Sequence, residues 1–252
     1  MPAPLTLPRL AWGDPSSSRH ALLVHGLGSN GALMWRYGLA LAEAGWYAVA
    51  VDLRGHGLAP RALDYTLDAY AADLSRTRPD GQDHWELVVA HSLGGAAATL
   101  AAAEHFGWTR RLILIDPAIH LNPHDRDVVR ESQERSFDDP SMAAVRAEHP
   151  HWHEQDVELK ALSAQQASRW AVEQTSEQNP EWDVRAAVAH LLVPTHVIAS
   201  DPEVYSIFKG ELVDEVRANP RVSVSVVKGA GHSPHRDLPE DTMRHLYDAL
   251  RA

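Results

Sequence analysis

The sequence has no cysteine among its 252 residues. The chain can therefore form no disulfide bond and has no thiol to serve as a nucleophile or a metal ligand. It also has no apolar run near the roughly 20 residues that a membrane-spanning helix needs. The start of the chain, Met1 to Leu5, lacks the basic and apolar regions of a secretory signal. These absences predict a soluble cytoplasmic protein.

Basic residues are fewer than acidic residues in this chain. Lysine and arginine number 23 against 34 aspartates and glutamates, which gives a formal net charge of -11. Nucleic acids and anionic membranes are bound by basic surfaces that release counterions, so we expect neither as a partner. Apolar residues, in contrast, make up 44% of the chain, which is enough for a full hydrophobic core.

Histidine is abundant, with 16 copies, and its densest group is His149, His151 and His153. These histidines alternate in a stretch that contains proline, and the sequence has neither an HExxH pattern nor a cysteine to join them. Such a pattern is more typical of solvated loop residues than of a metal centre. No metal site is expected.

Apolar segments alternate with helical patterns along most of the chain. Strand-like runs occupy residues 21–24, 46–51, 85–89, 111–115, 193–199 and 222–227, and helical patterns include 65–77, 96–103, 204–218 and 239–250. Strands that alternate with helices predict an α/β fold with a mainly parallel sheet, flanked by helices and joined by right-handed crossovers. A short edge strand is expected within residues 5–12, because Pro8 disfavours a central position.

The composition changes between residues 118 and 190. This segment is polar, rich in histidine and glutamate, and has a helical pattern without a strand-like run. We predict a core made of residues 1–117 and 191–252, with residues 118–190 inserted as a helical cap over the carboxyl-terminal edge of the sheet. Candidates for an apolar pocket are the aromatic residues that could equally form the core of the cap, Phe137, Trp152, Trp170 and Trp182, together with Trp35.

Ser92 lies between a predicted strand and an alanine-rich helix, with the small residues Ala90 and Gly94 on either side. A serine in a glycine-rich turn is commonly a helix cap. Here the strand before it and the helix after it favour a sharp, strained turn that holds the hydroxyl out at the end of the strand. His91, the preceding residue, is expected to form part of a pocket wall.

Other polar residues also follow predicted strands, namely Asp116, Asp201 and, after the last strand, His232. Ligands of open parallel sheets bind at the carboxyl ends of the strands. The order serine, aspartate, histidine is that of a catalytic triad in this architecture. A serine hydroxyl needs a neutral imidazole to accept its proton, and a carboxylate to orient that imidazole.

Four motifs in the correct order carry a family resemblance. They are His25-Gly26-Leu27-Gly28, Asp52-Leu53-Arg54-Gly55-His56-Gly57, Ala90-His91-Ser92-Leu93-Gly94-Gly95 and Gly229-Ala230-Gly231-His232. With them the chain resembles the α/β-hydrolase superfamily from about Leu22 to its end. The resemblance implies Ser92 as nucleophile, His232 as base, and an oxyanion hole formed by the backbone N–H groups of Leu27 and Leu93. Ala90 stands where the family more often has glycine.

The resemblance also ranks the candidate acids. Asp201 follows the strand after the cap, which resembles the usual position of the acid in the family, and we expect it to complete the triad. Asp116, at the end of the strand before the cap, is the alternative, because some members use that position. Glu203 ranks third.

The function that the resemblance implies is hydrolysis of a small or medium-sized ester or lactone through an acyl-serine intermediate, without a cofactor. Carbon–carbon bond hydrolases, thioesterases, perhydrolases, lyases and cofactor-free oxygenases use nearly the same residues, because one fold hosts many functions. A different alternative is a receptor that keeps the pocket and binds a ligand without turnover. The expected partner is a small-molecule substrate, and the sequence leaves the oligomeric state open.

Overall fold

The computed structural model describes residues 3–251. Its strands form one sheet in the order β1-β3-β2-β4-β5-β6-β7. Strand β1 runs antiparallel to β3, and all other neighbouring strands are parallel. The strands are β1 (Arg9–Trp12), β2 (His20–Val24), β3 (Tyr47–Val51), β4 (Leu87–His91), β5 (Leu112–Ile115), β6 (Thr195–Ala199) and β7 (Val222–Val226). The predicted α/β fold with a mainly parallel sheet is confirmed.

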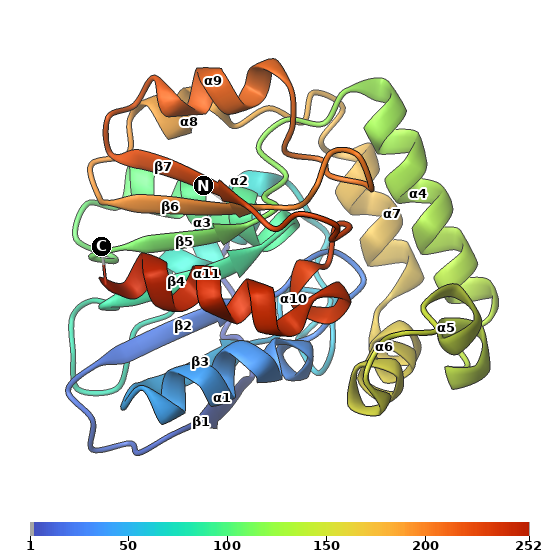
Figure 1. The fold of residues 1–252 in the computed structure, drawn as a ribbon, viewed down its shortest axis with the longest axis horizontal. Helices are drawn as coiled ribbons and strands as arrows, with labels where there is room; N and C mark the ends of the chain where they lie inside the picture. Colours follow the sequence, from blue (N-terminus) through green and yellow to red (C-terminus); the bar gives the residue numbers. More distant parts are fainter. Residues whose placement is uncertain (1–2, 252) are drawn as a thin grey trace.

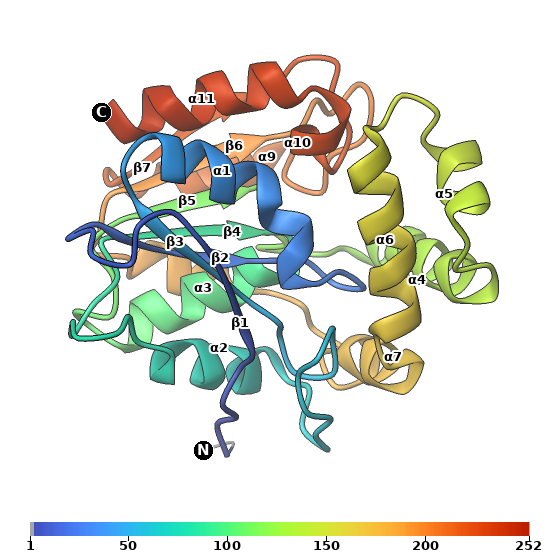
Figure 2. The same ribbon diagram turned by 90° about the horizontal axis from the view of Figure 1, so that it is seen from below.

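Helices cover both faces of the sheet, as Figure 2 shows with α11 and α1 above it and α2 and α3 below it. Along β2, Leu22 and Val24 join one buried apolar cluster and Leu23 joins the other. This burial on both faces explains why the central strands are continuous apolar runs. The helices of the core are α1 (Trp35–Glu43), α2 (Leu67–Arg76), α3 (Leu93–Glu104), α9 (Glu211–Arg217), α10 (Pro234–Asp237) and α11 (Pro239–Arg251), with the 3₁₀ helix η1 (Gly31–Met34).

Helix α3 lies unusually close to the loops that follow β2 and β5. A Cβ atom added to Gly94 would come within 2.5 Å of the His25 carbonyl oxygen, and one added to Gly95 within 2.7 Å of the Pro117 Cβ. The glycines and the alanines after them keep the helix surface small, so the first turn of α3 can sit against both loops. This close approach brings the ends of three neighbouring strands together around Ser92.

The segment between β5 and β6 forms α4 (Pro123–Asp138), α5 (Met142–Glu148), α6 (Glu154–Gln166), α7 (Arg169–Glu177) and α8 (Arg185–Ala189). Helices α4 to α7 stand as a group beyond one edge of the core (Figure 1), and we call them the helical insert. Helix α8 instead packs against α3 and α9 of the core. The boundaries of a cap at residues 118–190 stay a prediction.

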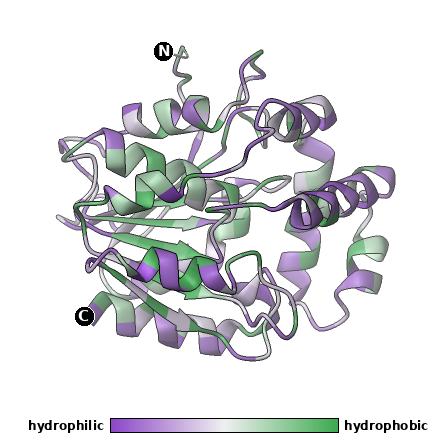
Figure 3. Ribbon diagram, turned by 90° about the horizontal axis from the view of Figure 1, so that it is seen from above, coloured by the Kyte–Doolittle hydropathy of each residue, from purple (hydrophilic) through white to green (hydrophobic). Residues whose placement is uncertain are grey.

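Polar contacts join the helical insert to the core. Lys160 Nζ and Ser163 Oγ of α6 donate to the Gly28 carbonyl at 3.1 and 3.2 Å. Arg36 of α1 forms an ion pair of 2.7 Å with the buried Asp156 of α6. Colouring by hydropathy shows the difference in composition, with hydrophobic strands in the core and a largely hydrophilic α4 (Figure 3). Within residues 3–251, no helix combines the length and the apolar character that crossing a membrane would require.

Candidate active site

Ser92 occupies a strained turn between β4 and α3. Its φ of 52° and ψ of -118° lie in a region that residues with a side chain rarely adopt. The turn is held by its own backbone, because the Ser92 N–H donates to Ile115 O at 3.1 Å and the Ser92 carbonyl accepts from Ala96 and Ala118. The loop after β2 approaches this turn closely and needs glycine at position 26, since a Cβ on Gly26 would lie 2.9 Å from the Ser92 Cβ.

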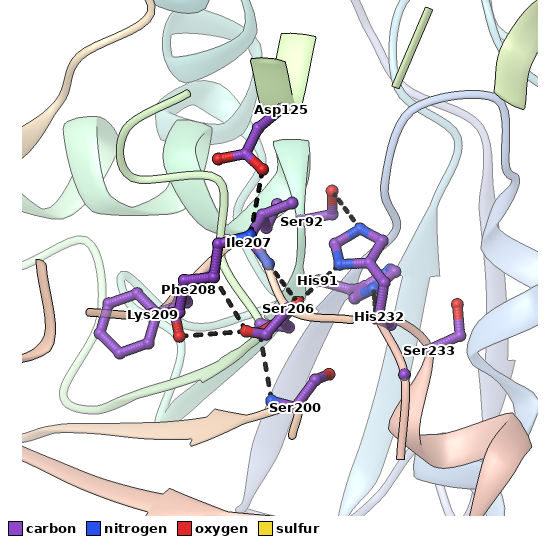
Figure 4. Close-up of polar contacts among 12 residues, drawn as sticks. His91, Ser92, Asp125, Ser200, Ser206, Ile207, Phe208, Lys209, His232 and Ser233 are labelled. Atoms are coloured by element: carbon purple, nitrogen blue, oxygen red, sulfur yellow. Dashed lines mark hydrogen bonds and ion pairs between the residues drawn. The ribbon is translucent and has the colours of Figure 1, made fainter. Parts of the chain in front are cut away.

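His232 connects the Ser92 hydroxyl to a carboxylate. Its Nε2 lies 3.0 Å from Ser92 Oγ, and its Nδ1 lies 2.7 Å from Asp116 Oδ2. Figure 4 shows the His232 ring facing Ser92, with a dashed line between the two side chains. An ionised carboxylate only accepts hydrogen bonds, so Nδ1 carries the proton and Nε2 is free to accept one from the hydroxyl. This is the tautomer that a base for serine must have.

Asp116, and not Asp201, contacts His232, which corrects the preference drawn from the sequence. The Asp201 carboxylate accepts the backbone N–H groups of Gly229 at 2.8 Å and Glu203 at 3.1 Å. These two hydrogen bonds lower the pKa of Asp201. Asp201 therefore shapes the loop that carries His232 without touching its ring. Glu203 contributes only its backbone to this loop and is not in contact with His232.

Four donors surround the fully buried Asp116 carboxylate. Oδ1 accepts from Ser200 N at 3.1 Å and Ser206 Oγ at 2.5 Å, and Oδ2 accepts from Ile207 N at 3.2 Å besides the His232 ring. These bonds offset the cost of burying the carboxylate and fix its direction. They also explain why the helix predicted over 204–218 begins later than expected. Helix α9 spans Glu211–Arg217, and Ser206 and Ile207 before it donate to Asp116 instead.

The backbone N–H groups of Leu27 and Leu93 were predicted to form an oxyanion hole. Leu93 is the first residue of α3, so its N–H has no acceptor within the helix. Within residues 3–251 neither N–H donates to a protein acceptor. Leu93 directly follows Ser92, and Leu27 lines the same cavity as Ser92. Their role in stabilising an oxyanion stays a prediction.

Two buried histidines support the loops around Ser92. His91 Nε2 donates to the His232 carbonyl at 2.8 Å, and burial together with the His232 charge holds the pKa of His91 well below its usual range. His25 Nδ1 donates to Gly26 O at 2.7 Å, while its Nε2 accepts from Leu53 N at 3.0 Å. Burial lowers the pKa of His25 to about 4. Both rings are therefore neutral, and their hydrogen bonds connect neighbouring loops.

A cavity of about 720 Å³ lies over Ser92 and His232, between the core and α4, α5 and α6. Of the six residues that the sequence proposed as pocket lining, His91 and Trp152 line this cavity. Trp152 Nε1 also donates to Asp237 Oδ1 at 2.7 Å, so this side chain links the helical insert to α10. A volume of this size suits a small or medium-sized ligand.

The other four predicted pocket residues lie elsewhere. Trp35 donates to Asp156 and Trp182 to the Ala118 carbonyl, so each is a structural contact. Phe137 lines a separate groove between α4 and α7, and Trp170 is 43% exposed beside Tyr65. A helical pattern shows that a segment is a helix, but it does not show which side of a polar helix faces a cavity. The positions of Trp35 and Trp182 are set by the acceptors that their indole N–H groups find, and not by the cavity.

Sequence reasoning missed the charged and polar residues that line the cavity. They include Lys160 of α6, Arg236 of α10, Gln133 of α4 and Tyr205 of the loop before α9. Charged residues in polar helices are usually solvated, so no pattern marked these. The histidines of the segment from 120 to 153 are not assembled into a metal centre, and among residues 3–251 no group of three or more histidine or acidic side chains is placed to hold an ion.

Comparison with known proteins agrees with this geometry. The model of the Alpha/beta hydrolase family matches residues 21–245. The chain is 33% identical to the lipase LipV of Mycobacterium tuberculosis (strain ATCC 25618 / H37Rv) over 154 residues, which are 60% of this chain and 57% of that lipase. The match thus spans less than two thirds of the length of LipV. The chain is also 27% identical over 213 residues to the esterase YbfF of Escherichia coli (strain K12), covering 79% of this chain and 80% of YbfF.

A solved structure has the same fold over nearly the whole chain. The crystal structure of E-2-(acetamidomethylene)succinate hydrolase superposes with a TM-score of 0.82 at 24% identity, covering 98% of this chain and 96% of that one. The predicted resemblance is confirmed, and these three similar proteins are hydrolases by name.

Proposed function

The chain belongs to the alpha/beta hydrolase family, and on that premise we propose that it hydrolyses a small or medium-sized ester or lactone through an acyl-enzyme intermediate on Ser92. The observation that carries the proposal is the continuous chain of contacts from Ser92 through His232 to Asp116 on the floor of the cavity. The lipase and esterase names of two relatives support an ester bond as the target.

In the first half of the reaction, Ser92 Oγ attacks the carbonyl carbon of the ester, and its proton passes to His232 Nε2. The Asp116 carboxylate stabilises the imidazolium that forms. The negative charge on the former carbonyl oxygen is bound by the N–H groups of Leu27 and Leu93. His232 then gives its proton to the leaving oxygen, the carbon–oxygen bond breaks, and the acyl group remains on Ser92.

In the second half, His232 accepts a proton from a water molecule that attacks the acyl carbon. The tetrahedral intermediate collapses, Ser92 Oγ recovers the proton from His232, and the carboxylic acid leaves. No step requires a cofactor. The helical insert and the rest of residues 118–190 act as a cap in this proposal, because α4, α5 and α6 supply one wall of the cavity and limit which substrates enter.

A serine-directed fluorophosphonate tests the acyl-enzyme step, together with turnover of a series of p-nitrophenyl esters and simple lactones. We expect one label per folded chain, located on Ser92 by mass spectrometry, and no label in Ser92→Ala. Labelling at another residue, or none in folded protein, would contradict the proposal. A ligand that binds tightly to wild-type protein without ever being turned over would favour the receptor alternative instead.

A further inference from the structure

Arg236 is a buried cation on the cavity wall that lacks an acidic partner. Arg236 is 5% exposed. It lies in α10, four positions after His232. Among residues 3–251, no carboxylate lies within 4.0 Å of it, and its Nε has no hydrogen-bond partner. Its guanidinium lies over the Trp152 ring at 5.2 Å and reaches Ser233 Oγ only at 3.5 Å. A buried guanidinium left in this state is costly unless something else pairs with it.

Lys160 of α6 is a second cation that lines the same cavity. Its ammonium group donates one hydrogen bond, to the Gly28 carbonyl at 3.1 Å, although it has three hydrogens to donate. No acidic side chain of the described residues lies within ion-pair distance of it. Burial, and then the charge of Arg236, lower the pKa of Lys160 to about 8. The charge of Arg236 therefore acts unfavourably on the protonated form of Lys160.

The acids nearest to these cations are engaged elsewhere. Both oxygens of Asp237 accept other donors, Trp152 Nε1 at 2.7 Å and Gly231 N at 2.8 Å. Glu148, at the rim, lies 3.6 Å from the exposed Arg135. Asp156 is paired with Arg36. In a chain with a net charge of -11, the cavity over Ser92 thus contains two poorly compensated cations.

We propose that Arg236 and Lys160 form a subsite for a carboxylate of the substrate, so that the ester cleaved at Ser92 carries a free acid group. This inference rests on the proposed function, because it names the class of ester that the same site takes. A carboxylate matches the fork of a guanidinium and can accept from an ammonium group at the same time. The Nη groups of Arg236, whose only hydrogen bond within residues 3–251 is the 3.5 Å contact with Ser233 Oγ, and the unused hydrogens of Lys160 supply these donors.

The test compares charged and neutral esters of the same shape. Monoethyl succinate, glutarate and adipate are each paired with the neutral ethyl ester in which an isopropyl group replaces the carboxylate. We expect wild-type protein to have a kcat/KM at least about tenfold higher for the best half ester than for its neutral partner, since a hydrogen bond to a charged group contributes about tenfold to a hundredfold. Equal values, or a preference for the neutral esters, would overturn the inference.

Variants show whether these two cations cause the preference. Arg236→Met and Lys160→Met should each lower kcat/KM for the half ester about tenfold or more relative to kcat/KM for its neutral partner. Arg130→Met removes an exposed charge of α4 outside the cavity and should change neither value. Lys160→Met keeps the test decisive if the buried Arg236 variant does not fold. An equal loss on both esters would mean that the cations are only structural.

Binding separates a failure of the subsite from a failure of the proposed chemistry. Titration calorimetry with glutarate on Ser92→Ala measures the subsite without turnover. Glutarate binding that weakens in the Lys160→Met background supports the subsite even if no ester is cleaved. Phosphonate labelling of Ser92 without any glutarate binding supports the chemistry and overturns the subsite.

Discussion

The core and the helical insert differ in how apolar their buried contacts are, and each supplies a different part of the site. In the core, strands β2, β4 and β5 are buried along their whole length between two apolar clusters. The insert has one small apolar cluster of its own, made of Val145, Trp152, Val157 and Ala161. It contacts the core through Ala171 of α7, which joins a core cluster, and through polar groups of α6. The core holds Ser92, His232 and Asp116, while the insert provides one wall of the cavity above them.

This difference separates chemistry from selectivity. The reactive groups sit where backbone hydrogen bonds and close packing determine each position, as in the Ser92 turn and the four bonds to Asp116. The wall of the insert depends on side chains such as Lys160, which donates to the Gly28 carbonyl at 3.1 Å. We therefore expect changes at the Ser92 turn and at Asp116 to act on kcat. Changes in the cavity wall, at Lys160 of the insert or Arg236 of α10, should act on the choice and binding of substrate.

The largest effect is expected from the acid of the core. Asp116→Asn removes the charge that stabilises the His232 imidazolium and favours the wrong tautomer, so kcat for an ester should fall about 10⁴-fold, as in a comparable triad. Asp201→Asn is the matched control at the neighbouring strand end. It should keep kcat within about tenfold, because Asp201 contacts two backbone N–H groups and the exposed Lys228 but not the His232 ring. Ester kinetics on both variants, with circular dichroism to verify folding, check this. A larger loss in Asp201→Asn would reverse the assignment.

The sequence predicted the core well because burial leaves a strong pattern. Strands buried on both faces must be apolar throughout, and β2 and β5 were recognised on that basis. The acid was misassigned because Asp116 and Asp201 both follow parallel strands that are neighbours in the sheet. The choice between them depends on the backbone, where Asp116 has a φ of 35°, and on donors from the loop after β6. No residue pattern encodes either feature.

The cavity wall was predicted less well than the fold. Four of the six proposed pocket residues lie outside the cavity, and Lys160 and Arg236 were not recognised. A polar helix has no dominant apolar side, so periodicity cannot show which side faces a ligand. Buried cations are also rare enough that sequence reasoning assigns a lysine or arginine to the solvated surface by default.

A smaller effect is expected when the attachment of the insert is weakened. Asp156 of α6 accepts from Trp35 Nε1 at 2.8 Å and pairs with Arg36 of α1. Asp156→Asn keeps the size but removes the charge, and we expect the free energy of unfolding in urea to fall by about 1–3 kcal/mol. Since the reactive groups lie in the core, KM should rise more than kcat falls.

The control for this variant is an ion pair that lies within the insert and is exposed. Asp127→Asn breaks the pair with Arg130 in α4, where both side chains are about 60% exposed. Surface pairs of this kind contribute between 0 and about 1 kcal/mol, so neither stability nor kinetics should change much. If Asp156→Asn lowered kcat as strongly as Asp116→Asn does, the separation between a catalytic core and a selective insert would be lost.

The smallest effect is a change in substrate preference with pH, which follows from Lys160. Its pKa of about 8 lies below the usual value for lysine, so the group is protonated below that pH and loses its charge as the pH rises through it. Arg236 and Glu148 are the charged groups that act on it; Arg236 lowers this pKa and Glu148 raises it. Only the protonated form attracts a carboxylate. The ratio of kcat/KM for monoethyl glutarate to kcat/KM for its neutral partner should therefore fall above about pH 8.

Taking the ratio of two esters in the same buffer cancels the titration of groups that act on both substrates, including those of the triad. The fall is bounded by the loss seen in Lys160→Met, about tenfold, because deprotonation removes one of the two charges and leaves Arg236. Lys160→Arg should keep a high ratio beyond pH 9, since a guanidinium remains charged there. Lys160→Met should give a low ratio that does not change with pH. A decline that persists unchanged in Lys160→Met would assign it to another group and leave the insert without a role in recognising charge.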